Sequence, residues 1–127
     1  MRIYCGTDIV EIHRIKKALD ETAGFREKIY TENEIKYCEE KKSQRYKSYA
    51  ARFSAKEAVA KALGTGFDKD IQPFDIEILN DEKNKPFVRL HGKISEEFIK
   101  REITRTDLSL SHCDTYAVAY FVALGEG

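Results

Sequence analysis

The chain has 127 residues and equal numbers of basic and acidic side chains, so its formal net charge is zero. A chain of this length most simply forms one domain, which we place over residues 1–127. The neutral balance argues against nonspecific attraction to nucleic acid or to an anionic membrane, and we expect neither as a partner.

The cysteines and the apolar segments indicate in which cellular compartment the protein is expected. Cys5, Cys38 and Cys113 are odd in number and lack CxxC spacing, which argues against a disulfide framework and against a zinc site. Asp8 and Glu11 interrupt the first apolar run, so no signal peptide is expected, and no apolar stretch is long enough to span a bilayer. The sequence therefore favours a protein of the reducing cytoplasm.

The first elements follow from apolar periodicity and capping. Residues 3–9 predict a strand that Gly6 interrupts, followed by a helix. The helix has three apolar residues at helical spacing: Ile12, Ile15 and Leu19. Thr31 and Glu34 form a capping box for a second helix that continues to about residue 42.

A long helix is predicted over residues 45–63, where Gly64 supplies a left-handed cap. The strict alternation in Phe74–Ile78 predicts a half-buried strand, and Pro86 opens a short strand that ends at Leu90. These elements mix helices with strands that follow one another closely along the chain.

The carboxyl-terminal part is expected to contain one more helix and a hairpin. The helix begins at Ser95, with three apolar residues turned inward: Phe98, Ile99 and Ile103. The hairpin pairs Leu108–His112 with Tyr116–Leu124. We therefore predict an α+β fold in which an antiparallel sheet packs against helices.

The long helix carries the sharpest anomaly. Glu57 lies in an apolar sector of the helical wheel, with Lys61 and Ser54 beside it. A carboxylate among apolar neighbours is costly unless it is paired or binds a metal. An ion pair between Glu57 and Lys61 is the ordinary alternative, and both explanations stay open. A separate stripe of small residues would let another backbone approach closely: Ala51, Ala55, Ala58 and Ala62.

Two further segments could carry chemistry. Asp8 lies where the first strand gives way to a helix, so it could point into a cleft or cap that helix. His112 ends an alternating strand on the face of Leu108 and Leu110, where a buried or interface histidine is the ordinary interpretation. Cys113 adjoins His112 but faces the other way along a strand, which argues against a Cys–His pair.

Three motifs together resemble the holo-[acyl carrier protein] synthase family. The first is Gly6–Ile12 (GTDIVEI), followed by Arg14 and Ile15. The second is Arg52–Ala58 (RFSAKEA), continued by KALGTG at residues 61–66. The third is Leu108–His112 (LSLSH), followed by DTYA at residues 114–117. The match runs in order over nearly the whole chain.

The resemblance implies an activity and a site. It implies a 4′-phosphopantetheinyl transferase fold and transfer of phosphopantetheine from coenzyme A to a serine of apo acyl carrier protein, in fatty acid biosynthesis. Adenosine 3′,5′-bisphosphate would leave. Asp8 and Glu57 would bind Mg²⁺, with Glu57 also the candidate base and Lys61 offsetting phosphoryl charge. The residues implied in coenzyme A binding are Arg52, Lys56, Lys61, Gly64, Ser111 and His112.

The resemblance also implies a homotrimer with coenzyme A between adjacent subunits. The apolar run Tyr116–Val122 does not alternate with polar residues, so we expect both faces of that strand to be covered. A neighbouring subunit or a wholly intramolecular core could provide the cover. The acidic carrier is expected to dock at Arg14 and Lys17, with Arg26 and Lys28 further along.

Two other functions use the same residues. A small Mg²⁺-dependent nucleotide pyrophosphohydrolase would employ the carboxylates to activate water. A non-catalytic nucleotide-binding or oligomerisation module would hold Glu57 and Lys61 as a plain ion pair. Incubation with coenzyme A, Mg²⁺ and an apo carrier protein distinguishes all three.

Overall fold

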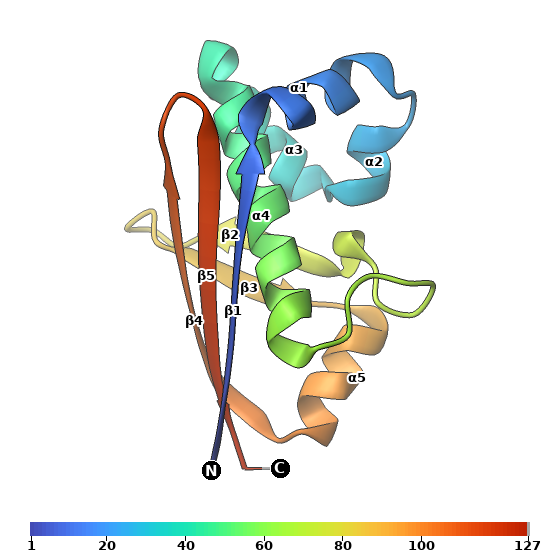
Figure 1. Cartoon of the computed structure of the whole chain (residues 1–127), viewed down its shortest axis with the longest axis vertical. Coiled ribbons are helices and arrows are strands. Elements are labelled where there is room, and N and C mark those ends of the chain that lie inside the picture. Colours follow the sequence, from blue (N-terminus) through green and yellow to red (C-terminus); the bar gives the residue numbers. More distant parts are fainter. Residues whose placement is uncertain (127) are drawn as a thin grey trace.

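A computed structural model describes residues 1–126, in which one long helix, α4, lies along a three-stranded sheet (Figure 1). The helices and strands are β1 (Arg2–Glu11), α1 (Ile12–Glu21), α2 (Phe25–Ile29), α3 (Glu32–Glu39), α4 (Arg45–Leu63), β2 (Ile76–Asn80), β3 (Pro86–Leu90), α5 (Gly92–Lys100), β4 (Ile103–His112) and β5 (Tyr116–Gly125). Short 3-10 helices cover Lys42–Gln44 and Pro73–Asp75. The predicted α+β class is confirmed.

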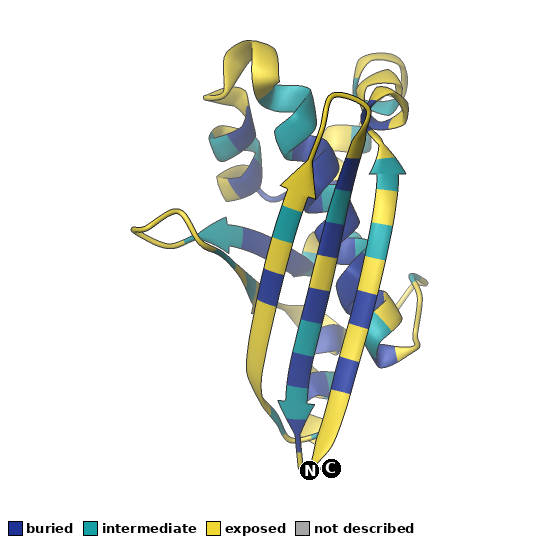
Figure 2. Ribbon diagram, turned by 60° about the vertical axis from the view of Figure 1, so that its left-hand side comes forward, coloured by how far each residue is buried: buried dark blue, intermediate teal, exposed yellow. Residues whose placement is uncertain are grey.

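The larger sheet is antiparallel, in the order β1-β5-β4, and β2 with β3 forms a separate two-stranded sheet. In Figure 2 the three long strands stand in front and the helices lie behind them. Buried bands alternate with less buried ones along β1 and β5 in that view, as expected for a sheet with one packed face, whereas β4 at the edge is mostly exposed. The helices therefore cover one face of the sheet.

The strand β1 and the helix α4 approach each other closely at Gly6. A Cβ atom on Gly6 would lie 2.0 Å from the Ala58 carbonyl oxygen and 2.7 Å from the Ala62 amide nitrogen. The strand and helix backbones are therefore in direct contact, which only a glycine at this position permits. Ala58 and Ala62 belong to the predicted stripe of small residues, whose expected role in close backbone approach is confirmed.

Two groups of buried side chains meet at α4. One lies between α4, the sheet, β2 and α5, and contains Val59, Ile78, Ile94 and Phe121. The other lies beneath α1, α2 and α3, and contains Tyr30 and Tyr49 among its members. Because α4 contributes to both, burial of α4 joins the two halves of the core.

The predicted capping residues at the start of α3 and at the end of α4 are confirmed. The Thr31 hydroxyl accepts from the Glu34 amide, and the Glu34 carboxylate accepts from the Thr31 amide, which completes the capping box. Gly64 has φ 75° and ends α4 in the left-handed conformation. The second helix ends at Glu39, earlier than expected, and a 3-10 turn follows.

Two expectations about the strands were wrong in detail, and one short helix was not predicted. β1 runs unbroken through Gly6, which pairs with Phe121, because a glycine can occupy extended backbone as well as a turn. β2 begins at Ile76, since Pro73–Asp75 forms a 3-10 turn instead. The short helix α2 follows Gly24, which has φ 81°, and was not predicted.

The helix expected from Ser95 begins earlier, at Gly92. It buries Ile94 completely, leaves Ile99 74% exposed and ends at Lys100, while Ile103 begins β4, so the predictions that Ile99 and Ile103 point inward from this helix were wrong. Phe98 is buried, as expected. Within residues 1–126, no helix combines the length and the apolar character needed to cross a bilayer.

The outer face of the larger sheet stays uncovered within this chain. Along β5, Ala117, Ala119 and Phe121 point to the helices and are buried. Tyr116 and Tyr120 point the other way and are 46% and 51% exposed. The single chain therefore does not provide the expected cover on both faces.

The contact at Gly6 generates a prediction. Gly6→Ala should lower the free energy of unfolding by about 3 kcal/mol, the upper end of the usual cost of overpacking, because the added methyl meets helix backbone. Urea denaturation followed by circular dichroism measures the loss. Cys5→Ala, on the exposed neighbouring position of β1, is the matched control and should change stability little. Equal stability of Gly6→Ala and the parent would contradict the close approach.

Candidate functional site

Asp8, Glu57 and Lys61 line one groove between β1, α1 and α4. Arg14 of α1 lines the same groove, and Phe53 is among its apolar walls. The groove therefore combines two carboxylates and two cationic side chains with an apolar lining.

Asp8 lies inside β1, paired with Ala119, rather than at the end of the strand. Its backbone oxygen accepts a hydrogen bond of 2.8 Å from the buried Ser54 hydroxyl of α4. The residue at the amino-terminal cap of α1 is Glu11, whose side chain makes no capping hydrogen bond. The alternative role of Asp8 as a helix cap was wrong, because the strand continues for three residues beyond it.

Lys61 approaches Asp8 rather than Glu57. Its Nζ lies 2.9 Å from Asp8 Oδ1, so that Lys61 forms its ion pair with Asp8. The Asp8 side chain is 13% exposed and the Lys61 side chain 53% exposed, so solvent screens one partner more than the other. The hydrogen bond that Lys61 donates to Asp8 raises the pKa of Lys61. The ordinary explanation of Glu57 as the partner of Lys61 is therefore not the arrangement found.

Glu57 is a half-buried carboxylate whose negative charge is not fully balanced by its neighbours. Burial raises the pKa of Glu57, the negative charge of Asp8 raises it further, and Lys61 opposes both. Two neighbouring carboxylates gain from a cation placed between them, because it offsets their mutual repulsion. Carboxylate oxygens are also the ligands that Mg²⁺ prefers, so Asp8 and Glu57 are chemically suited to hold it.

Residues 1–126 contain no cluster of three or more His, Cys, Asp or Glu side chains that could hold a metal. A cation between Asp8 and Glu57 would therefore need further oxygens from substrate or water. Mg²⁺ commonly binds through one or two carboxylates together with substrate phosphates and water. The two-carboxylate groove fits that mode of binding.

Arg52 and His112 line a second groove, together with Lys41 and Lys47. Arg52 and Lys61 are nine residues apart in α4, which places them about 180° apart around the helix. The residues predicted to bind coenzyme A therefore lie on opposite sides of α4 and do not all meet within one chain.

Arg52 is held at the base of the second groove. It is 3% exposed, its Nη2 donates to the Asn80 side chain, and its guanidinium carbon lies 3.9 Å from the centre of the Tyr37 ring. Among buried side-chain polar atoms of residues 1–126, Arg52 Nε is without a hydrogen-bond partner. A buried cation with a free donor is suited to an anionic ligand.

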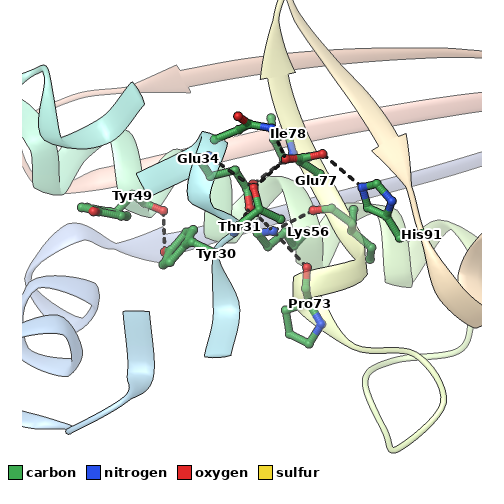
Figure 3. Close-up of polar contacts among 11 residues, drawn as sticks. Tyr30, Thr31, Glu34, Tyr49, Lys56, Pro73, Glu77, Ile78 and His91 are labelled. Atoms are coloured by element: carbon green, nitrogen blue, oxygen red, sulfur yellow. Dashed lines mark hydrogen bonds and ion pairs between the residues drawn. The ribbon is translucent and has the colours of Figure 1, made fainter. Parts of the chain in front are cut away.

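The position of Lys56 differs from its predicted role. Its side chain is fully buried, and Nζ donates to Glu34 Oε1 and to the carbonyl oxygens of Pro73 and Ile76 at 2.7–2.9 Å (Figure 3). These three acceptors use all three donors of an ammonium group. In this conformation Lys56 does not reach either groove, because its partners come from α3, from Pro73 and from Ile76 at the start of β2.

The remaining predicted residues are dispersed. Ser111 is exposed on the outer face of the sheet, opposite Val118 of β5. Gly64 closes α4 one turn after Lys61. Lys41 and Lys47, which line the Arg52 groove, were not among the predicted residues. The excess of positive charge over residues 36–61 is the sequence signal that could have found them.

Comparisons with known proteins agree with the three motifs. The family model described as the 4′-phosphopantetheinyl transferase superfamily (ACPS) matches residues 4–121. The holo-[acyl-carrier-protein] synthase of Ruminiclostridium cellulolyticum is 51% identical over 128 residues, covering 99% of this chain and 96% of the relative. That of Clostridium tetani is 45% identical, covering 99% of this chain and 98% of the relative.

Solved structures give the same family. A holo-(acyl-carrier-protein) synthase from Bacillus anthracis, in complex with CoA (3′,5′-ADP), is 38% identical with a TM-score of 0.79. The match covers 97% of this chain and 96% of that one. The Helicobacter pylori enzyme in complex with coenzyme A is 33% identical with a TM-score of 0.82, covering 94% of this chain and 99% of that one.

The electrostatics of the groove can be tested by titration. Asp8→Asn should move the pKa of Glu57 down, since a neighbouring negative charge is removed, and burial should keep it above its ordinary value. Lys61→Met should move the pKa of Glu57 up, since a nearby positive charge is removed. The carbon-13 chemical shift of the Glu57 carboxyl, followed against pH, measures both. Unchanged titration in the two variants would show that these three groups are not coupled.

Proposed function

This chain belongs to the holo-[acyl-carrier-protein] synthase family of the 4′-phosphopantetheinyl transferase superfamily, and we propose that it transfers 4′-phosphopantetheine from coenzyme A to a serine of an apo acyl carrier protein. The observation that supports this most is the convergence of Asp8, Glu57 and Lys61 in one groove beside Arg14. The reaction would serve fatty acid biosynthesis in the cytoplasm.

Asp8 and Glu57 are proposed to hold Mg²⁺ together with the pyrophosphate of coenzyme A. When bound, Mg²⁺ supplies positive charge that offsets charge on the phosphoryl oxygens. Lys61 already lies within 2.9 Å of Asp8, so its ammonium can turn to the phosphoryl oxygens without leaving the groove. Electrostatic stabilisation of this kind is the main requirement of phosphoryl transfer.

The transfer step breaks the phosphoanhydride bond of the coenzyme A pyrophosphate and forms a phosphoester bond to the carrier serine. The carrier serine oxygen attacks the β-phosphorus of coenzyme A, and the bond from that phosphorus to the bridging oxygen breaks. Adenosine 3′,5′-bisphosphate leaves with the bridging oxygen. Glu57 is the proposed acceptor of the serine proton, because its raised pKa makes it a stronger base than an ordinary glutamate.

Coenzyme A is proposed to extend between two copies of the chain. The groove with Asp8, Glu57 and Lys61 lies on one side of α4, and the groove with Arg52 and His112 lies on another. A neighbouring copy could bring its second groove beside the first groove of this chain. Ser111 and Gly64 are proposed as additional contacts with the coenzyme, whereas the burial of Lys56 argues against a direct one.

The uncovered outer face of the sheet supports association into a homotrimer. Tyr116 and Tyr120 of β5 are about half exposed there, and Ile3 and Ile9 of β1 are 66% and 63% exposed. Register places Ile9 opposite Val118 on the same face. A contiguous exposed apolar face of this kind is typical of an interface. The number three comes from the family resemblance, and closed cyclic symmetry would repeat one interface.

The carrier protein is proposed to dock at α1. Arg14 and Lys17 are exposed on that helix, and Arg14 lines the groove of Asp8 and Glu57. Arg26 and Lys28 are exposed on the neighbouring helix α2. A positive surface beside the groove would steer an acidic carrier toward it and would make association sensitive to salt.

Incubation with coenzyme A, Mg²⁺ and apo carrier protein, followed by mass spectrometry, tests the function. A gain of phosphopantetheine mass on the carrier with release of adenosine 3′,5′-bisphosphate is expected. Asp8→Ala and Glu57→Ala should each abolish the gain while circular dichroism stays unchanged, because each removes a proposed cation ligand. Full transfer by either variant would remove the metal-site proposal, and cleavage of coenzyme A without a carrier would indicate a pyrophosphohydrolase instead.

Charge reversal on α1 tests the docking surface. Arg14→Glu should raise the Michaelis constant for the carrier at least tenfold and change that for coenzyme A much less, since the proposed contact is with the acidic carrier. Steady-state kinetics with each substrate varied in turn measures the two effects. Glu21→Gln, a charge change elsewhere on α1, is the control. Equal losses for both substrates would contradict docking at α1.

Light scattering tests the assembly. At micromolar concentration the mass should be about three times the chain mass of 14.7 kDa. Val118→Asp should lower both mass and activity, because it places a charge on the proposed interface. Thr106→Asp, at an exposed position of β4, is the comparison for added charge on the same sheet. A fully active monomer would contradict the shared site while leaving the transfer activity in place.

A further inference from the structure

Glu34 and Lys56 form an ion pair whose side chains are both completely buried. Glu34 Oε1 accepts from Lys56 Nζ and from the Thr31 amide, each at 2.9 Å. Glu34 Oε2 accepts from the amide of Ile78 at 3.0 Å. The pair thereby connects α4 to the first turn of α3 and to β2, as Figure 3 shows.

A second buried carboxylate extends these connections to the surface. Glu77 Oε2 accepts from the Thr31 hydroxyl at 2.6 Å, and Glu77 Oε1 lies 3.0 Å from His91 Nε2. The Thr31 hydroxyl also accepts from the Glu34 amide, so it joins the two carboxylates. The contacts therefore run from Lys56 to His91 at the start of α5 (Figure 3).

Stability alone does not account for so many polar contacts around a buried charge pair. Removing two charges from water is costly, and replacing a buried ion pair by uncharged side chains of similar size is often neutral or stabilising. Burial lowers the pKa of Lys56 against the opposing effect of Glu34, which reflects this cost. What a buried pair can add is a unique geometry, since it forms only at one relative placement of its elements.

The placement at issue is the rotation of α4 about its own axis. Lys56 points to α3 and β2, whereas Ser54 is about 200° away on the wheel and bonds to the Asp8 backbone. Glu57 lies between these directions. A rotation of about 10° moves an atom at roughly 5–6 Å from the axis by about 1 Å. A displacement of ~1 Å in a reacting group can reduce a rate on the order of a hundredfold.

We propose that the Glu34–Lys56 pair is a positioning device for the transfer reaction, fixing the rotation of α4 so that the Glu57 carboxylate faces Asp8 across the groove. The inference rests on the proposed function, and it gives Lys56 a role without contact to coenzyme A. Glu34 and Lys56 act through α4 and touch no substrate. Contacts from Ser54 and Gly6 hold the opposite side of the same helix.

The double variant Glu34→Gln/Lys56→Met tests the proposal. It removes both charges together, and glutamine is a residue that capping boxes also use, so α3 keeps its start. The variant should unfold cooperatively at a temperature close to that of the parent. Its kcat per folded molecule should fall about ten- to a hundredfold. Its affinity for Mn²⁺ without coenzyme A, measured by electron paramagnetic resonance, should fall several-fold because Asp8 and Glu57 no longer face each other.

A matched control separates positioning from stability. Ile94→Val, at a fully buried position of α5, should lower the unfolding temperature and leave kcat and Mn²⁺ affinity at the parental values. Parental kcat or parental Mn²⁺ affinity in the folded double variant would overturn the proposal. If this double variant does not fold, Glu34→Gln/Lys56→Leu, which also leaves no unpaired buried charge, decides by the same two readouts.

Failure of the proposed function gives a different result. In that case the parent chain transfers nothing to the carrier protein, whatever happens in the variants. The Mn²⁺ affinities of the parent and the double variant still report on the groove, because that measurement needs neither coenzyme A nor turnover. Equal affinities would then overturn the positioning role as well.

Discussion

The direct contact between the backbones of β1 and α4 at Gly6 is the constraint on which the site depends. A side chain there would overlap the Ala58 carbonyl, so the strand and helix are as close as their backbones allow. Asp8 follows two residues later on the same face of β1, where the Ser54 hydroxyl of α4 holds its backbone. Side chains as short as aspartate and glutamate can share a cation only across such a narrow separation.

Different sides of α4 contact different parts of the molecule, which explains why this helix has no single apolar face. Ala58 and Ala62 meet β1, Val59 enters the core, and Lys56 bonds to α3 and β2. Glu57 and Lys61 face one groove and Arg52 faces another. The apolar residues of α4 do not repeat along one face in the sequence, because several sides of the helix are buried, each against a different neighbour.

Structural features that depend on residues close in the sequence were predictable, whereas contacts between residues distant in the sequence were not. The Thr31–Glu34 capping box, the Gly64 stop and the stripe at Ala58 each depend on a few adjacent positions. The ion pairs of Lys56 with Glu34 and of Lys61 with Asp8 join residues 22 and 53 positions apart. Lys56 was therefore assigned to coenzyme A, because a motif gives the residue type without its partner.

The proposed sharing of coenzyme A has a thermodynamic consequence for assembly. Burying the exposed parts of Tyr116, Tyr120, Ile3 and Ile9 would contribute roughly 1 kcal/mol each, since full burial of a large apolar side chain is worth about 1.5–3 kcal/mol. Association costs at least about 4 kcal/mol in lost translational and rotational freedom, so these contacts alone are marginal. A ligand that contacts Lys61 of one copy and Arg52 of another binds only the assembled state. By linkage it must strengthen the assembly by as much as the assembly strengthens its binding.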